Sequence, residues 1–411
     1  MKRFISVLLL LIFPIFLLAG CGQKNNQAEN EFKNKNWNDI LKSAKGTTVN
    51  FYGWGGSEQT NKWLDNYLSK ELKQKYNITL KRVPMDIDDI LNKMLGEKQA
   101  DGKGTIDVVW INGENFYTAK KNRLLYGPFT GKLPNYKKYI DQNSKDVQYD
   151  FGYPIDGYEA PYGKAQFVMI YDTAKVTNAP KNYEELMNFI KANPGKFTYP
   201  APPDFTGSAF VRNIIYDIVG YQKFSNMKPD KETVEKEIKP AIDYLEEIKP
   251  YLWNKGETYP SNISMLNNLY SEGQVLDTMS YNPNSVSQQI ENGQFPNTSK
   301  SFLFEKGTVG NTNFLAIPFN APNKAGAMAV INMVLSFDAQ YSKYNPDVWG
   351  DLPVFDNNKL DNSEKERLGK VKIGEGAIPQ EQLFKARLPE VPADLVPIIE
   401  KVWMENIPNK K

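Results

Sequence analysis

Apolar residues in the first quarter of the chain switch between the spacing of strands and the spacing of helices. Residues 37–44 place apolar side chains on one face of a short helix, and residues 48–52 alternate as a strand does. The same criteria predict a helix from Glu58 onward, a strand at residues 78–83, a helix at 87–95 and a nearly continuous apolar strand at 106–111. Strands and helices that alternate in this way form a parallel sheet, so the pattern indicates an α/β fold.

The second half of the chain is predicted to contain more helix. The pattern changes near residues 160–166, and residues 167–171 then form a predicted strand. Helices are expected at about residues 183–192, 208–219, 231–248, 261–271 and 323–336, with strands at 274–280 and near 314–317. We interpret the change near residue 160 as the crossing from a first lobe into a second.

The chain is longer than a single hydrophobic core normally supports, since it has 411 residues, and we therefore expect two lobes. Residues 37–160 are predicted to form lobe 1, residues 161–312 to form lobe 2, and residues 313–345 to return to lobe 1. Prolines divide residues 346–411 into short helices and turns, and the pattern assigns this tail to neither lobe.

The N-terminal residues form an export signal in this interpretation. Residues 1–20 begin with positive charge, continue as a short apolar run and end in small residues, whereas a membrane-spanning helix needs about 20 predominantly apolar residues. The segment that ends at Cys21 resembles the lipobox of bacterial lipoproteins, which implies that Cys21 is acylated and holds the protein at the cell membrane. Residues 21–36 would then be the lipidated cysteine and a polar tether. An uncleaved anchor helix is the alternative.

Composition excludes several kinds of chemistry. Cys21 is the single cysteine and histidine is absent, which removes disulfides, thiolate metal sites and every histidine-dependent catalytic site. The 50 basic and 48 acidic residues are spread along the chain, so nothing indicates a nucleic-acid partner. No glycine-rich nucleotide motif occurs. We therefore predict no catalytic residue, no metal and no cofactor, and favour a binding protein over an enzyme.

The segments after the first and third predicted strands are the first candidate ligand contacts, because ligands of parallel sheets bind beyond the carboxyl ends of the strands. Trp54, Gly55, Gly56 and Ser57 follow the first strand. Their glycines let a ligand approach the backbone, and the indole ring can stack on it. The alternative is a tight turn with Trp54 in the core.

Asn112, Glu114 and Asn115 follow the third strand. Glu114 is able to pair with a cationic group while the two amides form hydrogen bonds. A solvated helix start, where the helix dipole favours glutamate, is the equally weighted alternative.

The second lobe supplies five further candidates. Thr206, Gly207 and Ser208 precede a predicted helix, so their N–H and hydroxyl groups can face a cleft, although ordinary helix capping explains them equally well. Tyr281 and Asn282 follow a predicted strand and are expected to contact the ligand, the alternative being that they only stiffen the hinge.

The predicted crossing contains Tyr162 and Gln166. Tyr162 is included among the expected ligand contacts, and Gln166 is not. In the alternative interpretation both residues only stiffen a hinge.

The order of these segments resembles the solute-binding proteins of ABC importers, and most of all the YnjB-type binding proteins. The motifs that carry this resemblance are GWGGS at residues 53–57, DVVWINGEN at 107–115, APYG at 160–163 and FLAIPFNAPNK at 314–324. The resemblance implies a type II periplasmic-binding-protein fold of two α/β lobes with a hinge and an interlobe cleft. It also implies a monomer that delivers its ligand to a membrane permease and its ATPase.

The cargo is left open by these residues. Trp54, Tyr281 and Glu114 suit an organic cation such as thiamine or a polyamine, through cation–π and carboxylate contacts. Aromatic stacking with asparagine and glutamine side chains suits a sugar equally well. Two different functions remain as alternatives: a surface hydrolase with two carboxylates, and an adhesin that binds a macromolecule.

Overall fold

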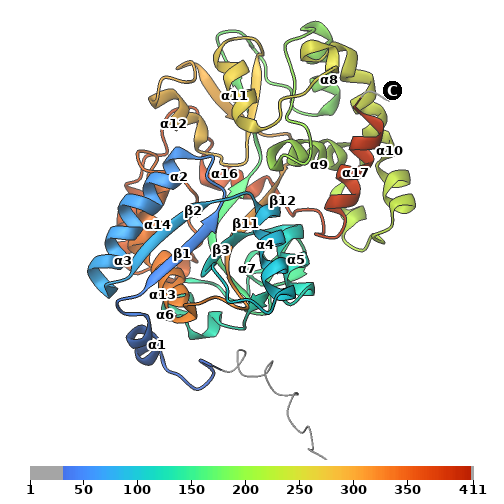
Figure 1. The fold of residues 1–411 in the computed structure, drawn as a ribbon. Helices are drawn as coiled ribbons and strands as arrows, with labels where there is room; N and C mark the ends of the chain where they lie inside the picture. Colours follow the sequence, from blue (N-terminus) through green and yellow to red (C-terminus); the bar gives the residue numbers. More distant parts are fainter. Residues whose placement is uncertain (1–30, 409–411) are drawn as a thin grey trace, which may run out of the picture.

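Two α/β lobes, one above the other in Figure 1, make up residues 31–408, the part of the chain that the computed structural model describes. The lower lobe contains the larger sheet and the upper lobe a smaller one. The predicted signal segment, Cys21 and the first part of the predicted tether lie outside the described residues. Within them, the predicted α/β class is confirmed.

The larger sheet has seven strands, and its centre has the predicted parallel order. Strand β1 (Thr48–Gly53) pairs in parallel with β2 (Thr79–Pro84) on one side and with β3 (Val108–Ile111) on the other. Beyond β3 lies β11 (Thr308–Pro318), which also pairs with β4 (Leu125–Tyr126), β7 (Glu159–Gln166) and β12 (Arg387–Leu388). A short hairpin of β5 (Tyr149–Asp150) and β6 (Tyr153–Pro154) stands apart from this sheet.

The helices of the lower lobe connect and cover these strands. They are α1 (Trp37–Ala44), α2 (Glu58–Lys62), a π-helical segment (Trp63–Leu68), α3 (Ser69–Tyr76), α4 (Ile87–Gln99), α5 (Gly113–Lys121), α6 (Pro134–Tyr139), α7 (Lys145–Gln148), α13 (Lys324–Val334) and α14 (Phe337–Tyr344). The predicted first helix therefore has its predicted bounds. The helix expected from Glu58 runs to Tyr76 with one π-helical stretch in it.

Alternate residues of the parallel strands supply two separate cores, one on each face of the sheet. Phe51 and Val108 belong to the core under α1, α3 and α13, whereas Tyr52 and Val109 belong to the core under α4 and α5. Neighbouring residues of a strand point to opposite faces, and both faces of this sheet are covered. This explains why residues 106–111 are almost continuously apolar.

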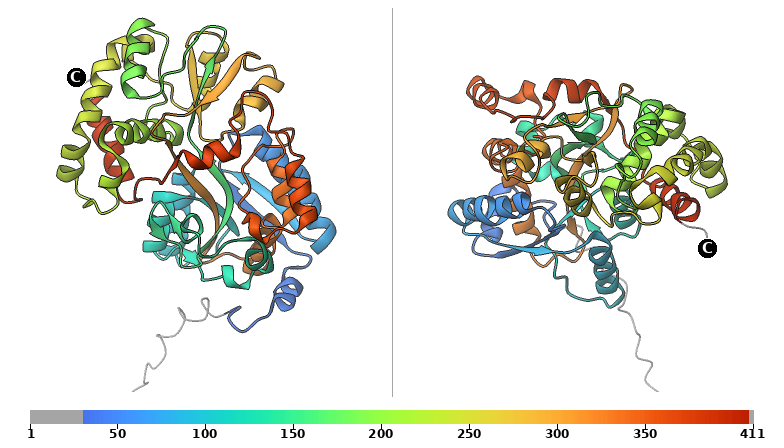
Figure 2. Two further views of the ribbon diagram at one scale, coloured as in Figure 1. Left: turned by 180° about the vertical axis from the view of Figure 1, so that it is seen from behind. Right: turned by 90° about the horizontal axis from the view of Figure 1, so that it is seen from above.

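Two antiparallel strands, β7 and β11, join the lobes and are seen as long neighbouring arrows in Figure 2. The sequence predicted a crossing but no strand at β7, because Pro161 and Gly163 are poor strand residues. Pairing with β11 forms the strand nevertheless, with an irregularity between Asn313 and Phe314. β11 is also longer than predicted, because its first half is polar.

The upper lobe is built on an antiparallel sheet in which β8 (Val168–Asp172) lies between β9 (Asp277–Ser280) and β10 (Ser299–Phe302). Its helices are α8 (Tyr183–Ala192), α9 (Phe205–Val219), α10 (Lys231–Ile248), α11 (Ile263–Ser271) and α12 (Ser285–Glu291). The predicted start of α9 at residue 208 is wrong. The Asp204 side chain accepts a hydrogen bond from the Gly207 N–H at 2.9 Å and starts the helix three residues earlier.

The tail contributes to both lobes. Trp349 packs in the lower core, and the tail then continues through α15 (Asn362–Gly369), α16 (Gln380–Lys385) and β12 to α17 (Val396–Asn406). In the upper core, Trp403 of α17 donates a hydrogen bond to the Tyr199 hydroxyl at 3.1 Å. The segment between β12 and α17 therefore passes the junction of the two lobes.

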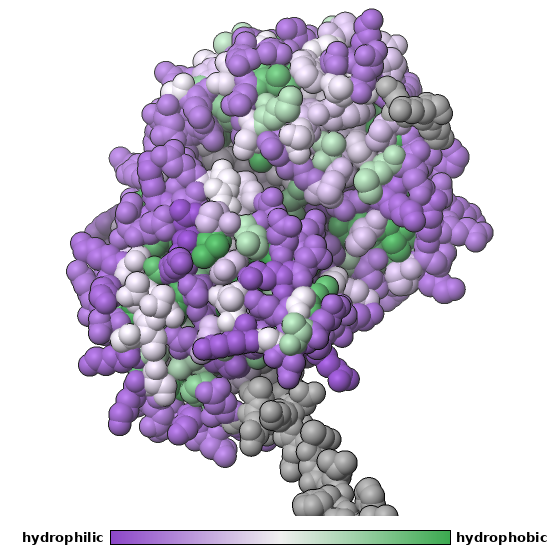
Figure 3. Space-filling model, in the orientation of Figure 1, coloured by the Kyte–Doolittle hydropathy of each residue, from purple (hydrophilic) through white to green (hydrophobic). Residues whose placement is uncertain are grey.

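The surface is mainly polar on the face shown in Figure 3, where the hydrophobic patches are small and separate. None of the helices formed by residues 31–408 has the length and apolar character needed to cross a bilayer.

Candidate functional site

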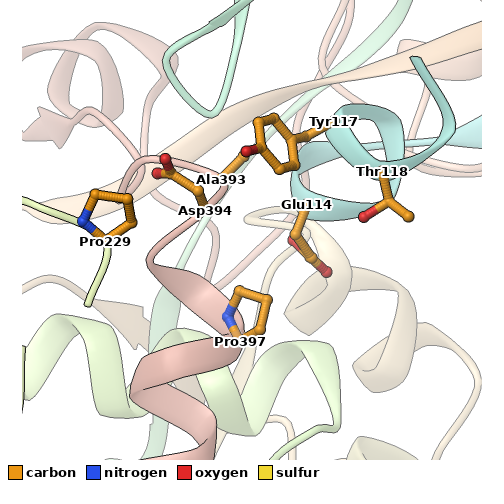
Figure 4. A pocket seen from close by; sticks show the side chains of 7 residues that line it. All are labelled: Glu114, Tyr117, Thr118, Pro229, Ala393, Asp394 and Pro397. Atoms are coloured by element: carbon orange, nitrogen blue, oxygen red, sulfur yellow. The ribbon is translucent and has the colours of Figure 1, made fainter. Parts of the chain in front are cut away.

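Two neighbouring pockets lie where the lower lobe, the upper lobe and the tail meet. The larger pocket has a volume of about 460 Å³, and its walls come from residues 145–153, residues 216–227, β11 and residues 387–394. The smaller pocket has a volume of about 270 Å³ and is drawn in Figure 4; its walls are Glu114, Tyr117, Thr118, Pro229, Ala393, Asp394 and Pro397. Tyr117, Ala393 and Asp394 belong to both pockets. A volume of this order is typical of sites for small molecules.

Helix α5 begins at this junction and carries Glu114 in its first turn. Gly113, with φ of 56°, packs so closely on Phe151 that a Cβ atom would lie 2.9 Å from the ring. The buried Asp150 carboxyl accepts a hydrogen bond from the Gly113 N–H. Asn112 donates to the Asn313 side chain at 2.8 Å and accepts from the Phe314 N–H at 3.0 Å, which ties the start of α5 to β11.

Glu114 is a carboxylate with incomplete hydrogen bonding. Its Oε1 atom accepts a hydrogen bond from the Asn115 side chain at 2.9 Å, whereas its Oε2 atom is buried and has no donor among the described residues. Burial raises the pKa of Glu114 to about 7, with a smaller contribution from the negative charge of Glu400, although a hydrogen bond from its own backbone N–H and, more weakly, Arg212 lower it. Glu114 is therefore poised to exchange a proton, or a cationic partner, near neutral pH.

A buried ion pair connects α9 with the tail. Arg212 binds Glu390 with two hydrogen bonds, Nε to Oε2 at 2.9 Å and Nη2 to Oε1 at 3.1 Å, and the two side chains are 1% and 2% exposed. Ser208 accepts a hydrogen bond from Arg212 at 2.6 Å and donates one to Glu400 at 2.6 Å. Tyr281 donates its hydroxyl proton to Glu390. These contacts satisfy both charges, as a buried pair requires.

Aromatic rings form much of the wall of the larger pocket. They are Tyr117, Tyr149, Phe151, Tyr153, Tyr216, Tyr221 and Phe224. The Tyr117 ring meets Tyr153 edge to face at 4.8 Å, and the ammonium group of the exposed Lys121 lies 4.3 Å from the centre of the Tyr117 ring. The same ammonium group donates a hydrogen bond to the Tyr117 hydroxyl, so it lies at the hydroxyl end of the ring.

Some of the residues predicted from the sequence meet at this junction. Glu114 lines the smaller pocket, and Ser208 and Tyr281 hold the ion pair beside it. Asn115 and Asn112 position Glu114 through their own hydrogen bonds and the start of α5. Among residues 31–408, no group of three or more His, Cys, Asp or Glu side chains is arranged to hold a metal ion.

The turn after β1 does not line either pocket. Trp54 is 46% exposed, and its ring packs on Gly56, where a Cβ atom would lie 2.2 Å from the indole. Gly55 packs in the same way on Pro84, at 2.5 Å, and Ser57 caps α2 by accepting a hydrogen bond from the Thr60 N–H at 3.2 Å. Packing and capping account for this turn, and a solute contact there stays a prediction.

Three other predicted residues have structural roles. Tyr162 is completely buried in the core of the lower lobe, where its ring meets Trp110 at 5.4 Å. Asn282 accepts a hydrogen bond from the Asn284 N–H at 3.1 Å. Thr206 is buried in the first turn of α9. Gln166, which was not predicted to bind ligand, donates a hydrogen bond to the Thr308 hydroxyl at 3.2 Å between the crossing strands.

Gly207 has a packing role that mutation can test. A Cβ atom at this position would lie 2.0 Å from the carbonyl oxygen of Pro200, so Gly207→Ala is expected to destabilise the protein by about 1–3 kcal/mol in urea unfolding. Gly96→Ala in α4 is the matched control, since nothing lies within 4 Å of a Cβ atom there. It should stabilise by about 0.5–1 kcal/mol. Equal effects of the two changes would contradict this role of Gly207.

Sequence reasoning missed Arg212, Glu390, Glu400, Tyr117 and Asp394. Arg212 carried a usable signal, because a lone basic residue in the apolar α9 helix needs a buried partner. Glu390, Asp394 and Glu400 lie in the tail, which the hydrophobic pattern could not assign to a lobe.

Comparison with known proteins places this architecture among binding proteins. A family model described as bacterial extracellular solute-binding protein matches residues 67–367. Protein YnjB of Escherichia coli (strain K12) is 36% identical over 371 residues, which cover 90% of this chain and 93% of YnjB. The resemblance to YnjB-type proteins seen in the sequence motifs is thereby confirmed.

Solved structures confirm the fold. The periplasmic binding protein AfuA from Actinobacillus pleuropneumoniae, with fructose-6-phosphate bound, superposes with a TM-score of 0.62 at 12% identity, over 88% of this chain and 98% of AfuA. The spermidine/putrescine ABC transporter substrate-binding protein PotD from Streptococcus pneumoniae gives a TM-score of 0.60 at 15% identity, over 87% of this chain and 98% of PotD. Both support the predicted periplasmic-binding-protein fold.

Proposed function

The chain belongs to the bacterial extracellular solute-binding proteins, and we propose that it captures an organic cation between its lobes for an ABC importer. Proteins of this family bind solutes and are not enzymes, so the hydrolase alternative is set aside. The AfuA structure has fructose-6-phosphate bound, whereas PotD is named as the substrate-binding protein of a spermidine/putrescine transporter, so the shared fold leaves the cargo open. The charged and aromatic groups at the junction of the lobes are what distinguish one class of cargo from another.

The observation that carries this proposal is the buried Oε2 atom of Glu114, for which residues 31–408 supply no hydrogen-bond donor. A buried acceptor without a donor is costly, and the cost is larger for a charged group. An ammonium group or another charged N–H donor supplies both the hydrogen bond and the opposite charge. An uncharged sugar hydroxyl supplies only the hydrogen bond.

The surroundings of Glu114 favour the same class of ligand. Asp394 lines the smaller pocket with it, and Glu400 lies close enough to raise its pKa. Tyr117 comes from the same helix as Glu114, and its side chain points toward the segment of Ala393 and Asp394 in Figure 4. Carboxylates next to an aromatic face are the combination that recognises organic cations.

Delivery to a transporter completes the proposal. A ligand that contacts α5 of the lower lobe and the tail beside the upper lobe binds the closed arrangement of the lobes best, and so shifts the population toward it. We expect the closed form to be recognised by the permease and its ATPase, with the protein held at the membrane by an acylated Cys21. Radiolabelled palmitate should then be incorporated by the wild type and not by Cys21→Ser.

Thermal melts of the purified protein test the cargo class. We expect the melting temperature to rise with an organic cation such as thiamine or spermidine and not with neutral sugars. A ligand present at 100 times its Kd adds about 2.7 kcal/mol of stability. A shift with sugars alone would favour the sugar alternative, and no shift with any small molecule would contradict solute capture.

A further inference from the structure

One part of the larger pocket differs in charge from the smaller pocket, which Glu114 lines. Lys145, Asp146 and Arg387 line this part of the larger pocket, and Lys164 lies behind Asp146. The Asp146 Oδ2 atom is 3.6 Å from the Lys164 Nζ atom and 3.5 Å from an Arg387 nitrogen. Two cations therefore share one carboxylate oxygen, and Lys145 adds a third positive charge.

The two cations that share Asp146 are largely withdrawn from water, whereas the carboxylate is not. The side chains of Lys164 and Arg387 are 16% and 11% exposed, and that of Asp146 is 42% exposed. Burial of cations beside one another is unfavourable unless negative charge compensates them. In agreement, burial and then Arg387 lower the pKa of Lys164, although Asp146 and, more weakly, Asp356 raise it.

Other acidic groups of the larger pocket do not compensate these cations. Glu390 is occupied by its two hydrogen bonds to Arg212. Asp150 is fully buried and its carboxyl accepts a hydrogen bond from the Gly113 N–H, and burial raises its pKa well above the usual range. Asp394, the remaining acidic residue of this pocket, lies in the wall that the two pockets share. Among the described residues, Asp146 is the carboxylate that pairs with both Lys164 and Arg387, so positive charge exceeds negative charge where Arg387 reaches the pocket wall.

The glycine at position 310 of β11 leaves room for the Arg387 side chain at the wall of the larger pocket. The Arg387 side chain lies against Gly310, where a Cβ atom would be 2.9 Å from the Arg387 Nε atom. Both residues line the pocket. A larger residue at position 310 would push the guanidinium group away from this wall.

We propose that the Arg387 end of the larger pocket binds an anionic group, phosphate or carboxylate, so that the solute is dipolar. Its cationic part lies at Glu114 and its anionic part at Arg387 and Lys145. The guanidinium fork suits a phosphate or carboxylate group with two parallel hydrogen bonds. This inference rests on the proposed function for the cationic part, whereas the anionic part stands on separate residues.

Calorimetric titration of the purified protein with matched compounds tests this inference. The pairs are thiamine with thiamine monophosphate and choline with phosphocholine; inorganic phosphate and glycerol 3-phosphate are titrated alone. For at least one pair we expect the phosphate ester to bind at least about tenfold more tightly than its parent cation. Arg387→Gln should weaken the ester about tenfold or more and leave the parent within about threefold.

Lys385→Gln is the matched control, since Lys385 makes an exposed ion pair with Glu381 on the neighbouring helix α16. It should change neither affinity. In the wild type, the ratio of the affinity for the phosphate ester to the affinity for its parent cation tests the inference even where Arg387→Gln does not fold.

The other outcomes separate the two proposals. Binding of inorganic phosphate or glycerol 3-phosphate that Arg387→Gln removes, without binding of any cation, would support the anionic end and contradict the proposed cation cargo. Binding of inorganic phosphate together with the parent cations would show that a separate anion fills the Arg387 end of the larger pocket. This outcome would support the anionic site and contradict a single dipolar solute. Absence of an ester preference in every pair, with no binding of inorganic phosphate, would overturn the inference.

Discussion

Replacement of Arg212 with methionine is expected to lower the free energy of unfolding by about 3–5 kcal/mol. The change leaves the Glu390 carboxylate, which is 2% exposed, without its two hydrogen bonds from the guanidinium group. It also removes the donor to Ser208, which links the pair to Glu400 in the tail. Urea unfolding followed by tryptophan fluorescence measures the loss.

Two companion variants make this test specific. Arg367→Met breaks an exposed ion pair with Asp338; the side chains of Arg367 and Asp338 are 45% and 56% exposed. This variant should lower the free energy of unfolding by at most about 1 kcal/mol. The double variant Arg212→Met with Glu390→Met removes both buried charges and should lose less stability than Arg212→Met alone. A loss below about 1 kcal/mol for Arg212→Met would show that the pair does not hold α9 to the tail.

Glu114→Gln is expected to stabilise the protein at pH 8 while it weakens binding of a cation. The folded state raises the pKa of Glu114 from its ordinary value of 4.5 to about 7, so it binds the proton more tightly than the unfolded chain does. Stability from this group is therefore complete below about pH 4.5 and is lost as the pH rises through 7. An amide has no charge to bury, and the gain at pH 8 should be about 3 kcal/mol.

Melting temperatures of wild type and variant at pH 5 and pH 8 check this sign. We expect Glu114→Gln to be more stable than the wild type at pH 8 and about equal to it at pH 5. The control is Glu58→Gln, which alters an exposed pair with Lys62 and should have almost no effect at either pH. A variant less stable than the wild type at pH 8 would contradict the burial of an uncompensated charge at Glu114.

The sequence sufficed to predict the parts of the fold that local pattern controls. Helix α1 has its predicted bounds, and β1, β2 and β3 pair in the predicted parallel order. These elements show their burial directly in the spacing of apolar residues. β7 was missed as a strand because Pro161 and Gly163 oppose strand formation locally, and the long pairing with β11 decides its structure.

The candidate site could be predicted only in part, for a related reason. Glu114 was found because it follows a strand end, and a topological rule covers that position. Its neighbours Glu390 and Glu400 come from the tail, almost 300 residues further along the chain, and no local pattern indicates that contact. Trp54 was chosen by the same rule, and its ring packs on Gly56 outside both pockets, so its contact with a solute stays a prediction.

Calorimetric titration of an organic cation at pH 8 and pH 6, with wild type and Glu114→Gln, tests the central claim most directly. A pKa of about 7 leaves Glu114 about 90% ionised at pH 8 and about 10% ionised at pH 6. The wild type should therefore bind thiamine or spermidine about tenfold more weakly at pH 6, and Glu114→Gln should bind weakly at both pH values. Cation binding that is equally tight in both proteins at both pH values would show that the carboxylate at the lobe junction is not the receptor site.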